Sequence, residues 1–154
     1  MSMSPGGCAR IVALPADPES AVVPLDRETL AWLSEARVSP YGGPTVRWGS
    51  TQRATSGALV VGDRLGEEAR WRRYLALHRH GGVEACYSHC VHAYREIRVF
   101  PLRHIVGLAW HVLALQKDAC DCWGITAPFE VSVALQGTSG ATLGSFAGGV
   151  RNPV

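Results

Sequence analysis

Residues 101–117, PLRHIVGLAWHVLALQK, decide the fold because they carry the clearest helical pattern in this sequence. Pro101 suits the first turn of a helix, where a missing amide hydrogen costs nothing. Apolar side chains cover most of the helix circumference and leave only a narrow polar strip. The apolar face comprises Leu102, Ile105, Val106, Ala109, Val112 and Leu113, and Leu108, Trp110 and Leu115 extend it. The pattern predicts a central helix that the rest of the chain encloses.

Two more helices and one ambiguous segment are predicted upstream of this helix. Asp26 can cap a helix that runs to about Arg37, because its side-chain oxygen can accept early amide hydrogens. Residues 67–80 predict a second helix, since several large side chains fall within one arc of about 100°. Residues 83–99 fit both a helical and an extended period, and we favour a strand for 83–94 as well as for the rest of this segment.

Short strands complete the predicted fold. Residues 45–48 and 57–62 are bounded by turn residues, and residues 129–135 alternate between apolar and polar side chains before a glycine-containing turn. The turn and residues 141–146 predict a terminal β-hairpin. The expected class is α+β, with a small, mostly antiparallel sheet packed around the central helix. We expect an irregular N-terminal arm over 1–24, where prolines recur, one domain over 25–147, and a tail over 148–154.

Composition excludes several classes of protein. The chain has 154 residues, of which 47% are hydrophobic and 18% charged, values typical of a globular domain. No segment reaches the roughly 18 uninterrupted apolar residues that a membrane span needs, and residues 1–10 show no secretory signal. The formal net charge of +2 gives little long-range attraction for nucleic acid or an anionic membrane. We therefore expect a cytoplasmic protein with no membrane partner.

Catalytic motifs are absent from the sequence. It has no phosphate-binding loop of the G-x-x-x-x-G-K-[ST] type, no G-x-S-x-G elbow and no H-E-x-x-H zinc-hydrolase sequence. Catalytic groups can still converge in space from scattered positions. Binding is nevertheless the expected role, rather than catalysis.

The cysteines and histidines form the most suggestive chemical cluster. Thiolate and imidazole are ligands that zinc prefers. If residues 83–94 were helical, Cys86 and Cys90 would share a face and could be joined by Cys120 and Cys122 from a loop. In a strand, Cys86 and Cys90 would stand roughly 13 Å apart, too far for one ion. Free cysteines also commonly fill core space, so the expected cofactor is none, with zinc as the alternative.

Two further groups of side chains could bind something. Arg70, Arg72, Arg73 and Arg79 would give a predicted helix a basic face, which could bind phosphates or simply be solvated. His104 and His111, with Trp110, could line a pocket near the polar strip of the central helix.

Three parts of the sequence carry a family resemblance: WRRYLALHRHGGVE at 71–84, the central helix after it, and FEVSVAL at 129–135. Together they resemble the C-terminal regions of bacterial DNA-binding proteins of the AlbA/Schlafen-like group. The resemblance covers residues 40–147. It excludes the N-terminal module to which that group owes its nucleic-acid role, so it implies an accessory or regulatory domain. The cysteine cluster has no role in that group.

These observations favour a non-catalytic binding or regulatory module that contacts a protein or a small ligand. The first alternative is a nucleic-acid-associated transcriptional regulator that uses the four arginines. The second alternative is a zinc-stabilised protein.

Overall fold

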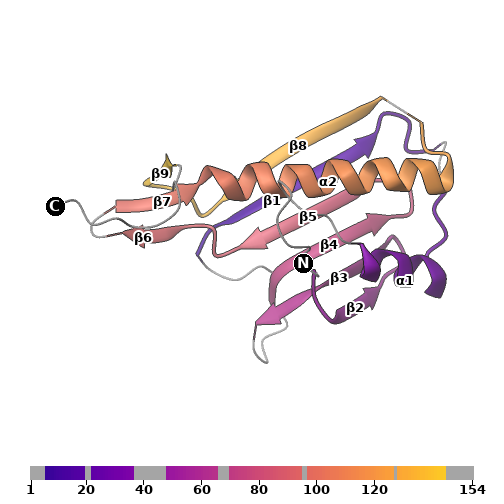
Figure 1. The fold of residues 1–154 in the computed structure, drawn as a ribbon, viewed down its shortest axis with the longest axis horizontal. Helices are drawn as coiled ribbons and strands as arrows, with labels where there is room; N and C mark the ends of the chain where they lie inside the picture. The colour runs from indigo at the N-terminus through magenta and orange to yellow at the C-terminus, as the bar shows by residue number, and fades with distance from the viewer. Residues whose placement is uncertain are drawn as a thin grey trace.

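Two sheets and two helices make up the computed structural model, which describes residues 6–19, 22–36, 48–65, 70–94, 97–126 and 128–144 (Figure 1). Six strands form an antiparallel sheet in the order β2-β3-β4-β5-β1-β8. These strands are β1 (Cys8–Pro15), β2 (Thr51–Ala54), β3 (Ala58–Leu65), β4 (Arg70–His78), β5 (Val83–Ser88) and β8 (Phe129–Gln136). A second sheet of order β6-β7-β9 contains β6 (His92–Tyr94), β7 (Ile97–Pro101) and β9 (Ala141–Gly144). The helices are α1 (Arg27–Glu35) and α2 (Leu102–Trp123). The α+β class is therefore confirmed.

Helix α2 runs along one face of the large sheet and covers β1 and β5 (Figure 1). Its inner side chains include Leu108, Val112 and Leu115, each at most 5% exposed. Small residues oppose them on the sheet, among them Ala9 and Ala85, which belong to the same buried cluster. The predicted packing of the central helix on the sheet is thus confirmed. The prediction that the rest of the chain encloses this helix is wrong, because Leu102, Val106, Trp110 and Leu113 are each at least 40% exposed.

Helix α2 extends six residues beyond the predicted end at Lys117. Nothing between Asp118 and Trp123 breaks a helix, so the chain continues to Gly124. Gly124 adopts a left-handed conformation with φ 65°, and its N–H donates to Cys120 O over 2.8 Å. Glycine is the residue that most readily ends a helix in this way.

The helix predicted over 67–80 is wrong, because residues 70–78 form β4, while 66–69 lie outside the described residues. The register between β3 and β4 shifts between Asp63 and Arg64. This irregularity brings Trp71 and Tyr74, three residues apart, into one buried cluster. A bulge interrupts the strict alternation of side chains between the two faces of a strand. Residues three apart can then point to the same face, and this spacing explains why the sequence of this strand resembles that of a helix.

The irregular arm predicted over 1–24 is also wrong, since residues 8–15 form β1 between β5 and β8. Ala9, Ile11 and Ala13 alternate into the core and are fully buried. Pro15 closes the strand, and the other prolines lie outside it, so none of them interrupts an inner position of the ladder.

Of the remaining predictions, some are confirmed and one is wrong. Helix α1 begins after Asp26, whose Oδ1 accepts a hydrogen bond from Thr29 N at 2.9 Å, as expected. Residues 83–88 are extended, which confirms the favoured strand, and 58–65 form β3. The terminal hairpin is wrong: β8 pairs with β1, whereas β9 pairs in parallel with β7 in the other sheet. Residues 45–47 and the tail at 148–154 lie outside the described residues.

Candidate binding surface

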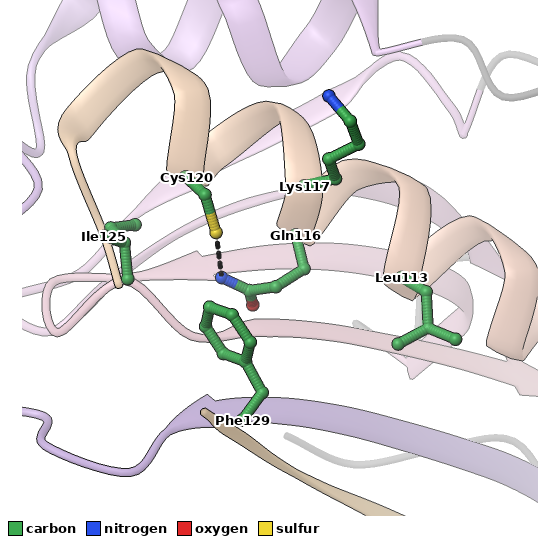
Figure 2. A pocket seen from close by; sticks show the side chains of 6 residues that line it. All are labelled: Leu113, Gln116, Lys117, Cys120, Ile125 and Phe129. Carbon is green, nitrogen blue, oxygen red and sulfur yellow. Dashed lines mark hydrogen bonds between the residues drawn. The ribbon is translucent and has the colours of Figure 1, made fainter. Parts of the chain in front are cut away.

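A cavity of about 300 Å³ lies between the C-terminal half of α2 and the start of β8. Figure 2 shows Leu113 and Cys120 projecting from α2 towards the sheet and Phe129 reaching up from β8, while the amine end of Lys117 points away from the sheet. Gln116 and Ile125 complete its lining. The two elements thus enclose a mostly apolar hollow.

Gln116 fixes the helix to the sheet below this cavity. Its side chain is buried, its Oε1 accepts from Val83 N at 3.1 Å, and its Nε2 donates to Gly81 O at 2.9 Å. The amide also approaches Cys120 Sγ at 3.9 Å (Figure 2). Its hydrogen-bonding capacity is therefore used within the protein.

An exposed apolar stripe continues from the cavity along α2. Its members are Leu102, Val106, Trp110 and Leu113, which are 40%, 40%, 55% and 49% exposed. At 100° per residue these four positions fall within an arc of about 80°, so they share one side of the helix. Because Leu113 lines the cavity together with Phe129, this side of α2 is the one towards β8.

Strand β8 adds three apolar side chains beside this stripe. Val131, Val133 and Leu135 are 44%, 53% and 41% exposed. Their register partners in β1 are Ala13, Ile11 and Ala9, which are buried in the cluster that contains the inner side of α2. Directly paired residues of neighbouring strands point to the same face. The three side chains therefore lie on the helix-covered face, where α2 does not reach over them.

We call these seven residues the α2–β8 surface: Leu102, Val106, Trp110, Leu113, Val131, Val133 and Leu135. Large exposed apolar side chains scattered singly are ordinary on protein surfaces, whereas a contiguous group commonly marks a contact site. This surface has the helix as one wall and β8 as its floor, with the cavity at one end.

Charged and polar side chains form a separate network around Glu84 on the opposite face of the sheet. Glu84 is only 4% exposed. Arg10 binds both of its carboxylate oxygens, through Nε at 2.8 Å and Nη2 at 2.9 Å. The Tyr74 hydroxyl donates to Oε1, and His78 Nε2 lies 3.1 Å from Oε2. The His78 ring stacks on the His80 ring with 5.2 Å between centroids.

This network holds Glu84 ionised. Burial opposes ionisation, but the hydrogen bonds from His78, Arg10 and Tyr74 outweigh it and lower the pKa of Glu84 to about 2. Burial and the bond to Glu84 raise the pKa of Tyr74 above its usual value, so Tyr74 stays a donor. A paired carboxylate with saturated oxygens is suited to holding β1, β4 and β5 together rather than to accepting a substrate proton. Sequence reasoning missed it, and the only available signal was an acid within the apolar strand VEACYS.

The four predicted arginines are spread along an extended segment instead of a helix face. A strand rises about 3.3 Å per residue, so Arg70 and Arg79 stand roughly 30 Å apart along the chain. Arg73 Nη2 pairs with Asp63 Oδ2 at 2.8 Å, and Arg79 Nε donates to Ser56 O at 3.4 Å. Arg70 and Arg72 have exposed side chains. Phosphate binding by this set stays a prediction.

The four predicted zinc ligands lie in different surroundings. Cys86 is buried with Cys8 on one face of the sheet, and Cys90 belongs to the core cluster under α2. Burial raises the pKa of Cys90 to about 11 and raises that of Cys86 as well, so both remain thiols at neutral pH. Cys120 lines the cavity of Figure 2, and Cys122 is exposed near the end of α2. Within the described ranges, no three metal-binding side chains gather closely enough to hold an ion. Zinc binding stays a prediction.

The predicted pocket around His104, His111 and Trp110 is divided between two sides of α2. Trp110 belongs to the α2–β8 surface, whereas His111 is buried and meets the Trp48 ring edge-on, with 5.4 Å between centroids. Trp110 and His111 therefore lie in different surroundings, and a pocket lined by both stays a prediction. The side chain of His104 lies outside the described part of the structure.

Comparison with known proteins found no match to any family model, curated protein or solved structure. The resemblance to the AlbA/Schlafen-like group therefore stays a prediction. No helix among the described residues is both long and apolar enough to cross a membrane.

Proposed function

We propose that this chain is a non-catalytic binding module and that its α2–β8 surface receives an apolar segment of a protein partner. One observation carries the proposal: seven apolar side chains, each 40–55% exposed, lie on one helix and on the edge strand that lines a cavity together with it. A stable fold gains nothing from leaving them in water, since each would lower the free energy if buried. A contact site accounts for their grouping.

The surroundings support contact rather than reaction. Lys117 and Asp121, on the same helix, pair with each other at 2.6 Å. The ionisable network of Glu84 lies on the other face of the sheet. Interface centres are commonly rich in aromatic and aliphatic side chains with a charged rim, and Trp110 and Leu113 fit that composition.

A cytoplasmic setting belongs to the same proposal. All five cysteines, Cys8 included, are free thiols. Reducing compartments preserve free thiols, whereas oxidising ones favour disulfides.

A random peptide library displayed on phage tests the proposal. We expect the wild-type chain to enrich peptides with spaced aromatic and aliphatic residues. We expect Leu113→Glu to abolish that enrichment, because it places a charge in the apolar stripe where the stripe meets the cavity. Leu143→Glu is the matched control, since Leu143 is 56% exposed and lies on β9 of the other sheet. Loss of enrichment in both variants, or no enriched peptide with the wild type, contradicts the proposal.

A further inference from the structure

Strand β8 is the last strand of the six-stranded sheet, and one of its two edges has no neighbour among the described strands (Figure 1). Its eight residues make a long edge. An open edge presents unpaired N–H and C=O groups that can bind another strand. The question is which residues provide those groups.

The hydrogen bonds to β1 identify them. Ala16 N donates to Pro128 O at 3.0 Å, which continues the β1–β8 register by one pair. Bonded and non-bonded pairs alternate along an antiparallel ladder. Glu130, Ser132, Ala134 and Gln136 therefore bond β1. The outward N–H and C=O groups belong to the intervening residues, Phe129, Val131, Val133 and Leu135.

Within its own eight residues, strand β8 lacks the prolines, lysines and bulges that usually protect an edge. Its sequence FEVSVALQ contains no proline or lysine, and its only charged residue is Glu130 near one end. The register with β1 runs without a shift from Phe129 to Gln136. Natural sheets commonly blunt a free edge with charges, prolines or bulges, so this edge is suited to pairing.

We propose that a second copy of this chain pairs with β8 along this edge, as two antiparallel β8 strands related by a two-fold axis at Ser132. Val131 of one copy then lies opposite Val133 of the other, and Phe129 lies opposite Leu135. This register uses all four outward residues of each strand, and Glu130 faces Ala134 rather than a like charge. The inference rests on the proposed function because it assigns a second copy to one border of the α2–β8 surface.

Pairing in this register doubles the floor of the α2–β8 surface. In each copy, α2 lies over β1 and β5. Because neighbouring strands stand about 4.8 Å apart, the two helix axes are separated by roughly 20 Å. The stripes containing Trp110 and Leu113 then face each other across the paired β8 strands. The dimer has an apolar groove with two helical walls where the single chain has one wall.

The area of this contact predicts a moderate affinity. Eight paired backbone residues with three half-exposed apolar side chains on each copy bury on the order of 1,000 Å² in total, at the low end for specific interfaces. Interfaces of that size associate weakly, so we expect a dissociation constant of about 1–100 μM.

Sedimentation velocity of the full chain tests the proposal. Between about 1 and 300 μM, a range that brackets this affinity, we expect the wild type to convert from monomer to dimer. Val131→Pro should remain monomeric throughout, because it removes an outward N–H and leaves the bonds to β1 intact. Val133→Arg should also stay monomeric, while Val22→Arg, at a valine 70% exposed outside the sheets, should dimerise like the wild type.

Wild-type chain that remains monomeric at the highest concentration overturns the proposal, as does a Val131→Pro variant that dimerises normally. Circular dichroism checks that each variant is folded. The outcome is separable from the proposed function, because Leu113→Glu leaves the β8 edge intact and should still dimerise while it loses peptide enrichment.

Discussion

Gly62 in β3 shows how a single residue limits the packing of the sheet. A Cβ atom at this position would lie 2.2 Å from the Arg73 carbonyl oxygen and 2.9 Å from the Trp71 ring. Trp71 is 1% exposed, and the Arg64 guanidinium lies 4.9 Å from its ring centre. We expect Gly62→Ala to lower the free energy of unfolding by about 1–3 kcal/mol, because overpacking displaces backbone. Gly57→Ala is the control in urea denaturation, since nothing lies within 4 Å of a Cβ there.

Glu84 sets the response of the fold to acid. Its pKa falls from 4.5 to about 2 on folding, so the stabilisation is complete above pH 4.5 and is lost as the pH falls towards 2. We expect a loss of about 3 kcal/mol over this range, from about 1.4 kcal/mol per pKa unit. Urea denaturation between pH 2 and 7 measures it.

Glu84→Gln should remove this pH dependence and lower stability at pH 7 by about 3 kcal/mol, because Arg10 loses its buried partner. Glu35→Gln, at an exposed carboxylate in α1, should leave the acid limb of the wild type unchanged. If Glu84→Gln loses stability at low pH as the wild type does, other carboxylates cause that loss.

Two glycines, Gly107 inside α2 and Gly124 directly after it, should have opposite effects when replaced. Gly124 ends the helix with a positive φ, and alanine there should cost about 1 kcal/mol because its Cβ disfavours this conformation. Gly107 lies inside the helix with open space around it, so alanine should stabilise by about 0.5–1 kcal/mol. Thermal unfolding of both variants measures the difference, and equal signs would contradict the assigned helix end.

The same helix shows what an element's pattern can and cannot reveal. Its position and apolar face were predictable because apolar residues recur at helical spacing over more than four turns, whereas its last six residues were not predicted. Which side remains open was not, since Leu113 and Val112 are equally apolar in the sequence while one is 49% exposed and the other fully buried. Only the width of the sheet beneath the helix decides this.

At the scale of the whole molecule, dimerisation should make thermal stability depend on protein concentration. A dimer that separates on unfolding gains stability by mass action, so Tm should rise by about 2 °C for each tenfold increase in concentration for a domain of this size. Val131→Pro should abolish the rise. A calorimetric series above and below the dissociation constant makes the comparison.

By itself, the sequence determined the α+β class, the α1 cap at Asp26, the position of α2 and the extended character of 83–88, because local periodicity and capping chemistry specify each of them. The tertiary structure alone decided that 8–15 is an inner strand, that 70–78 is extended, that β8 joins β1 instead of β9, and that Arg10, Tyr74, His78 and Glu84 meet. The physical reason is that strand pairing joins residues distant in the chain. A strand's partners and its open edge are properties of the assembled sheet, and the pattern of a single segment contains no record of them.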